Sequence, residues 1–111
     1  MIDTAIKMKV PLEKRKEVLQ TVKVILVPIR RERGCISCDC YADVEDENTL
    51  YFKEEWKSWQ DLESHLKSQR FAVLIGAMSL LAVEPDIVFS IKIPTAGIEA
   101  INAAKNALLK I

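Results

Sequence analysis

The sequence of 111 residues lacks the features that mark several classes of protein. Its sixteen basic and sixteen acidic side chains cancel, so no positive excess is available to hold nucleic acid or an anionic membrane. No run approaches the roughly 18 consecutive apolar residues of a membrane-spanning helix. The first residues also lack the charged start and apolar run of a secretory signal peptide. We therefore expect neither nucleic acid nor a membrane among the partners.

Cysteine and histidine are also scarce, with three and one respectively. An odd cysteine count without a secretory signal is typical of a reducing cytoplasm with free thiols, so we expect a cytoplasmic protein. Half of the residues are hydrophobic and 29% are charged, which is usual for a soluble globular protein. The length fits one folding unit that can bury its own core.

Alternation of apolar and polar residues predicts four strands, at residues 2–10, 35–44, 50–56 and 86–93. A polar hairpin turn is predicted at 45–48 between the second and third strands.

Helical spacing of apolar residues predicts the intervening helices. The first begins with Pro11 at its first position and ends before Gly34. Ser58 opens the second, because an acidic residue, Asp61, follows three positions later in the capping-box pattern. A further helical run continues from Phe71 to Leu81, before Pro85. The alanine-rich residues 98–110 predict a terminal amphipathic helix.

The order of these elements, βαββαβ plus a helix, predicts an α+β fold of the ferredoxin-like sandwich type. Its antiparallel sheet would carry both main helices on its apolar face. The opposite face is mixed, and it could meet water or a second copy. We take residues 1–94 as the folded domain and residues 95–111 as a C-terminal amphipathic helix.

Glu54 is the first candidate site residue, because it shares strand parity with Phe52 and Trp56 and should point toward the apolar side. Burial raises the pKa of a carboxyl group unless a cation lies nearby, and such groups often mark functional sites. Equally open is a structural role, in which Glu54 pairs with an arginine or caps a helix.

His65 is the second candidate, as the single imidazole of the chain. It lies beside the inner-face residues Leu62 and Leu66, where it could border a pocket and act as a base or hydrogen-bond donor. A structural histidine at the edge of the core is the alternative.

The spacing Cys35-x-x-Cys38-x-Cys40 suggests a metal or redox site, but strand geometry argues against it. Cys35 would face away from Cys38 unless the strand is bulged. Cys38 and Cys40 would lie about 6.6 Å apart along the strand, at the edge of disulfide geometry. Zinc needs four ligands, and only His65 could complete the set. We therefore predict no metal site.

Four segments in order resemble the antibiotic-biosynthesis monooxygenase family. They are Gly34-Cys35-Ile36-Ser37, the polar turn 43–48, Glu54-Glu55-Trp56, and the helix 61–68 with His65, followed by Phe71. The resemblance covers about residues 2 to 93. It implies a dimeric α/β barrel, in which the sheets of a homodimer pair face to face, and a pocket between sheet and helices.

Characterised members of that family oxidise aromatic polyketides, quinols or haem with dioxygen, mostly without flavin or metal. The resemblance therefore implies a cofactor-independent monooxygenase that oxidises an aromatic or quinol-like small molecule. His65 and Glu54 would handle protons, and the pocket would be lined by Cys38, Phe52, Trp56, Phe71 and Met78. Haem degradation is disfavoured, because by this resemblance Thr4 or its neighbour, His65 and Ile75 stand where that branch has Asn, Trp and His.

Two other functions stay open. One is a non-catalytic protein on the same dimeric barrel that binds a small ligand or serves a stress response. The other is an interaction module whose terminal helix docks on a partner or on the twin subunit.

Overall fold

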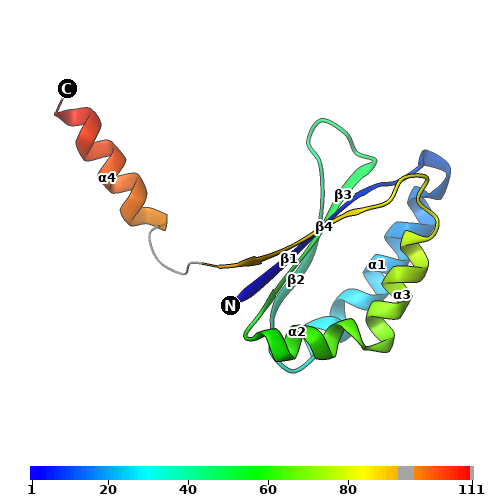
Figure 1. Cartoon of the computed structure of the whole chain (residues 1–111). Coiled ribbons are helices and arrows are strands. Elements are labelled where there is room, and N and C mark those ends of the chain that lie inside the picture. The colour runs from blue at the N-terminus through cyan, green and yellow to red at the C-terminus, as the bar shows by residue number, and fades with distance from the viewer. Residues whose placement is uncertain (93–96, 111) are drawn as a thin grey trace.

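A single antiparallel sheet with helices on one side forms the body of the protein (Figure 1). The computed structural model describes residues 1–92 and 97–110. The strands are β1 (Ile2–Lys9), β2 (Cys35–Ala42), β3 (Thr49–Trp56) and β4 (Asp86–Ile91). The helices are α1 (Arg15–Arg30), α2 (Trp59–Leu66), α3 (Gln69–Met78) and α4 (Gly97–Leu109), with a 3-10 turn at Leu12–Lys14.

The strand order is β2-β3-β1-β4, and every neighbouring pair is antiparallel. This arrangement confirms the predicted ferredoxin-like α+β fold. The sheet is open along its two edge strands, so a barrel would need a second copy, and the homodimer stays a prediction.

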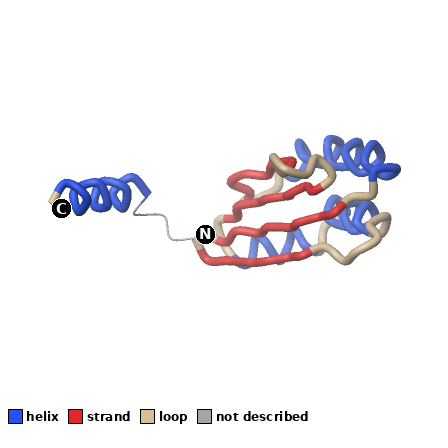
Figure 2. Tube along the Cα trace, turned by 90° about the horizontal axis from the view of Figure 1, so that it is seen from above, coloured by secondary structure: helices blue, strands red, loops and turns tan. Residues whose placement is uncertain are grey.

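The core lies between the sheet and the helices, where the apolar faces of both meet (Figure 2). Alternation along β1 and β3 turns every second side chain toward the helices, and these side chains are buried. In α1, apolar residues at helical spacing share one face, and four aliphatic residues on that face are buried. The sheet contributes Ile6, Met8, Leu50, Phe52 and Trp56, and the helices contribute Val18, Val22, Ile25, Ile29, Leu62 and Leu74.

The start of α2 confirms the predicted cap. The backbone N–H of Asp61 donates to Oγ of Ser58 over 3.2 Å. A second serine cap, Ser68, accepts from the N–H of Phe71 and starts α3 as a separate helix. The two caps place α2 across one end of the sheet and let α3 run beside α1 (Figure 1).

Several predicted boundaries were wrong. Pro11 has an extended backbone and precedes the 3-10 turn, so α1 begins only at Arg15. The helix expected to reach Leu81 ends at Met78, where the chain tightens into turns bonded three residues apart. The predicted strand end at Ile93 and the domain boundary at 94/95 lie outside the described residues. Across residues 1–92 and 97–110, no helix combines the length and apolar character needed to cross a membrane.

Candidate functional site

Glu54 lies at the centre of three strands and points toward the helices, as predicted. It pairs with Thr4 on β1 and with Cys38 on β2. The residue is only 1% exposed. The Thr4 hydroxyl donates to Oε1 of Glu54 over 2.9 Å, and the Trp56 ring nitrogen lies 3.4 Å from the same oxygen. A carboxylate in this position is held by neighbours on every strand that flanks it.

The last turn of α2 brings His65, which is fully buried, onto this carboxylate. Its Nε2 lies 2.7 Å from Oε2 of Glu54, close enough for an ion pair but without the alignment of a hydrogen bond. The Trp56 ring stacks on the imidazole with centroids 4.6 Å apart, and the Phe71 ring meets it edge-on at 5.2 Å. Two aromatic rings therefore fix the orientation of His65.

On its other side His65 meets a second carboxylate, Glu32, from the connection after α1. The Nδ1 of His65 lies 2.9 Å from Oε2 of Glu32. The same oxygen lies 3.1 Å from Nε of Arg70 on α3. The Glu32 side chain is 11% exposed and that of Arg70 is 41% exposed. Charges thus alternate along a row from the buried Glu54 to the surface. We call Thr4, Glu54, His65, Glu32 and Arg70 the Glu54 network.

The charge of this network depends on the proton of His65. Burial alone lowers the pKa of His65, but contacts with Glu54, and then with Glu32, outweigh it and hold the pKa above its ordinary value. With a protonated imidazole, two cations balance two anions. A neutral imidazole would leave an uncompensated negative charge beside the core.

The three cysteines all turn toward the helices, which differs from the prediction for Cys35. A register shift between Cys35 and Ser37 places an extra residue in β2, so Cys35 pairs with Trp56 and faces inward. All three thiols are free. Burial, aided by the charge of Glu54, raises the pKa of Cys35 to about 11. Burial also raises the pKa of Cys38 and of Cys40, so these thiols stay protonated.

No group of three metal-binding side chains suited to a metal ion occurs within residues 1–92 and 97–110. The inward cysteines instead pack with the core. Their environment, apolar and beside a carboxylate, disfavours the thiolate form that binds metals and attacks disulfides.

The structure brings five of the seven predicted site residues together: Glu54, His65, Trp56, Phe71 and Cys38. The remaining two belong to the surrounding core. Phe52 lies opposite Cys40 and is fully buried, and Met78 packs against the core from α3. The catalytic and lining roles of all seven stay predictions.

Sequence reasoning missed the outer part of the network. Glu32 stands in the basic run Arg30-Arg31-Glu32-Arg33 and was not among the predicted site residues. Arg70, five residues after His65, carried no signal of its own. A single acid among three arginines, in a run that ends directly before Gly34, was the available clue to Glu32.

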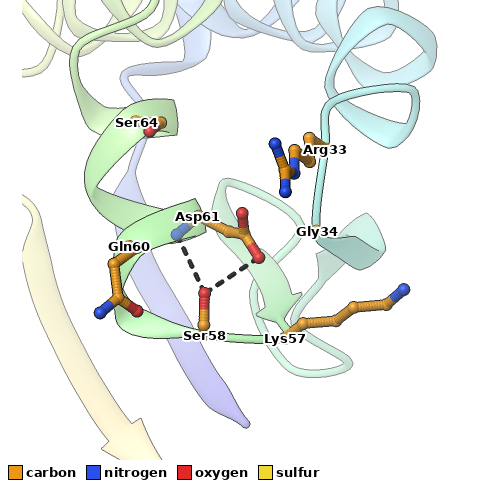
Figure 3. A pocket seen from close by; sticks show the side chains of 7 residues that line it. All are labelled: Arg33, Gly34, Lys57, Ser58, Gln60, Asp61 and Ser64. Atoms are coloured by element: carbon orange, nitrogen blue, oxygen red, sulfur yellow. Dashed lines mark hydrogen bonds between the residues drawn. The ribbon is translucent and has the colours of Figure 1, made fainter.

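Two cavities have members of the network, or their neighbours in the sequence, among their lining residues. The larger, about 570 Å³, opens at the start of α2 and is lined by Arg33, Gly34, Lys57, Ser58, Gln60, Asp61 and Ser64 (Figure 3). In Figure 3 the Asp61 carboxylate is engaged by the Ser58 hydroxyl, at 3.0 Å. The second, about 350 Å³, is a hollow on the open face of the sheet; Thr4 and Glu54 are among its lining residues, but their side chains are buried on the other side, toward the helices. Its size suits a small ligand.

Comparison with known proteins assigns the chain to a protein family. The sequence pattern of the family described as antibiotic biosynthesis monooxygenase matches residues 1–76. The chain belongs to this family. Antibiotic biosynthesis monooxygenase membership supports a monooxygenase-like function in general terms, and it agrees with the resemblance noted in the sequence.

Solved structures share the fold. A conserved protein from Methanosarcina mazei Go1 is 29% identical, with a TM-score of 0.78 over 83% of this chain and 92% of that one. A Deinococcus radiodurans protein, provisionally named an antibiotic biosynthesis monooxygenase, is 17% identical, with a TM-score of 0.80 over 87% of this chain and 97% of that one.

A sequence relative is longer than this chain. An uncharacterized protein of Synechocystis is 29% identical over 77 residues, and the match spans 69% of this chain but only 52% of that relative.

Proposed function

We propose that this family member oxidises an aromatic or quinol-like small molecule with dioxygen, without a bound flavin or metal. The observation that carries the proposal is the buried pair of Glu54 and His65, 2.7 Å apart and enclosed by the rings of Trp56 and Phe71. A carboxylate and an imidazole in a desolvated site can take up a proton and stabilise developing negative charge.

The reaction needs only substrate, dioxygen and proton transfer. An electron-rich methylene or phenol loses a proton to the site and becomes an anion. The anion gives one electron to dioxygen, and the radical and superoxide combine to form a carbon–oxygen bond. The peroxide takes back the proton. For a methylene substrate, loss of water then breaks the O–O bond and leaves a carbonyl, so one oxygen atom enters product and the other enters water.

Each member of the Glu54 network has a role in this scheme. Glu54 takes the proton, while Thr4 holds its other oxygen. The His65 imidazolium lies 2.7 Å from Oε2 of Glu54 and offers positive charge to the anion. Glu32, the carboxylate nearer the surface, exchanges protons between Nδ1 of His65 and water, and Arg70 holds it in place by an ion pair. The network is thus a proton path with one buried end.

We place this site in a homodimer, in which the open faces of two sheets pair. The polar open face supports this, because Oδ1 of Asp3 is buried there without a hydrogen-bond partner and lies at the hollow beside Glu54. A second copy would cover this hollow and the rest of the open face of the sheet.

Oxygen uptake by purified, metal-stripped protein with a panel of quinols and anthrones tests the proposal. We expect turnover above the uncatalysed rate. Glu54→Gln and His65→Gln should each lower that turnover by about 100-fold or more, the usual contribution of a general base. Glu63→Gln is the matched control, because this exposed carboxylate of α2 pairs only with Lys67 at the surface.

Circular dichroism of each variant would separate loss of chemistry from loss of fold. Full activity in folded Glu54→Gln and His65→Gln would refute the assignment of the site. The absence of turnover with every compound, from a folded wild-type protein, would refute this class of reaction and favour a ligand-binding protein.

A further inference from the structure

The helix α4 is not packed against the rest of the chain as the structure describes it, residues 1–92. All of its residues are exposed, including the large apolar side chains Ile98, Ile101, Leu108 and Leu109. Figures 1 and 2 both show α4 apart from the sheet and from the other helices. The radius of gyration, 16.9 Å, exceeds the roughly 13 Å of a compact chain of this length. A helix of 13 residues is only marginally stable alone in water, so α4 needs a partner surface.

An exposed row of apolar side chains on β4 is a surface on which α4 could pack. Ile87, Phe89 and Ile91 pair with Ile6, Thr4 and Ile2 of β1, so they share the face that packs on helices elsewhere in the sheet. All three are nevertheless exposed, and the main contacts of α1 and α2 with the sheet are to β2 and β3. Phe89, Ile91 and Ile2 line a groove of about 290 Å³ with Trp59, whose ring meets Phe89 edge-on. We call Ile2, Trp59, Ile87, Phe89 and Ile91 the β4 strip.

The helix and the strip match in length. The six residues of β4 span about 20 Å at the usual rise of an extended strand. The thirteen residues of α4 also span about 20 Å at the rise of an α-helix. One helix can therefore cover the whole strip.

Charge selects the direction in which α4 would lie. Glu84 and Asp86, both exposed, stand at the beginning of β4. The exposed cations Lys105 and Lys110 lie in and just after the second half of α4. When α4 runs antiparallel to β4, its basic end meets this acidic end, whereas the parallel direction leaves both groups without opposite charges.

We propose that α4 of one copy packs on the β4 strip of a second copy, and that the two copies exchange these helices. The second copy is the favoured occupant because α4 stands clear of its own sheet while it presents an unpaired apolar face. Exchange is reciprocal in a two-fold dimer, so both helices and both strips become covered at once. This proposal does not depend on the oxygen chemistry.

Mixed crosslinking tests the exchange directly. One full-length chain carries Phe89→Cys, and a second, with a size tag, carries Ile101→Cys. A short bismaleimide should join them into a covalent heterodimer when the two are mixed. Ala103→Cys replaces Ile101→Cys in the matched control, because it lies on the opposite face of α4. The unsubstituted chain reports any background from Cys35 and Cys40, the half-buried native thiols.

Quenching of tryptophan fluorescence by acrylamide gives a second readout. Trp56 is fully buried and Trp59 is 49% exposed, so Trp59 dominates the response. We expect Trp59 to be protected in concentrated protein and to lose that protection on dilution. Ile101→Asp with Leu108→Asp should abolish the protection at every concentration.

Two results would overturn the proposal. Protection that is independent of dilution, with crosslinks only inside a chain that carries both cysteines, would show that α4 folds onto its own strip. Absence of both protection and crosslinks would show that the strip is not the docking site of α4.

Discussion

Stability should fall as pH rises above neutral, because His65 binds a proton in the folded protein that it releases on unfolding. The pKa of His65 in the folded state is raised above its ordinary value of 6.5. Below pH 6.5 both the folded and the unfolded state hold the His65 proton, and the contribution of the network to the free energy of unfolding is fully present. Between pH 6.5 and the raised pKa of His65 in the folded protein, only the folded state holds the proton. The free energy of unfolding then falls by up to about 1.4 kcal/mol per pH unit.

Urea unfolding at a series of values from about pH 5.5 to about pH 8 measures this slope. His65→Gln should remove it, whereas Lys67→Gln, an exposed cation on the same helix, should leave it unchanged. The pH series stops at about pH 8 so that ionisation of the cysteine thiols does not contribute to the measured slope. Thiols of the unfolded chain ionise above about pH 8.5, while burial keeps Cys35 and Cys38 protonated in the fold, which adds a further decline.

Two outcomes would refute this reasoning. One is a wild-type stability that stays constant or rises across the window. The other is an equal slope in His65→Gln, which would assign the titration to other groups. Because the whole stability of such a domain is about 5–15 kcal/mol, a one-proton slope is readily measured.

Three further predictions concern single positions. Glu32→Gln should lower the pKa of His65, because it removes the charge at Nδ1; an imidazole titration followed by NMR that does not move would contradict this. Gly34→Ala should cost at least about 1 kcal/mol by calorimetry, since Gly34 has φ +83° and an added Cβ would strike the Asp61 carboxylate; an unchanged melting temperature would contradict it. The Cys38 thiol should react with a maleimide far more slowly in folded protein than in urea, and equal rates would contradict its burial.

Much of the fold was predictable from the sequence because it follows local rules. Strict alternation placed β1 and β3, and the same parity correctly turned Glu54 toward the helices. The cap at Ser58 located α2, and with it the burial side of His65. These are properties of a few neighbouring residues, which a sequence displays directly.

The rest of the candidate site depends on contacts between distant segments. The prediction for Cys35 assumed strict alternation of side chains along β2. The extra residue between Cys35 and Ser37 breaks this alternation and turns Cys35 toward the helices. Glu32 lies in a connection where no periodicity applies, and its direction is set by α2 and α3. The cation near Glu54 proved to be His65 rather than an arginine, because the angle of α2 against the sheet brings the imidazole there.

The position of the Glu54 network along the chain has a consequence for how this protein can be altered. All of its groups lie between Thr4 and Arg70, and the family pattern also ends at residue 76. Segments after α3 supply none of these charges, although β4 still completes the sheet beside β1. The terminal helix can therefore be exchanged, lengthened or fused to another protein while the buried charges keep their partners. A change in α4 therefore leaves the residues of the Glu54 network in place.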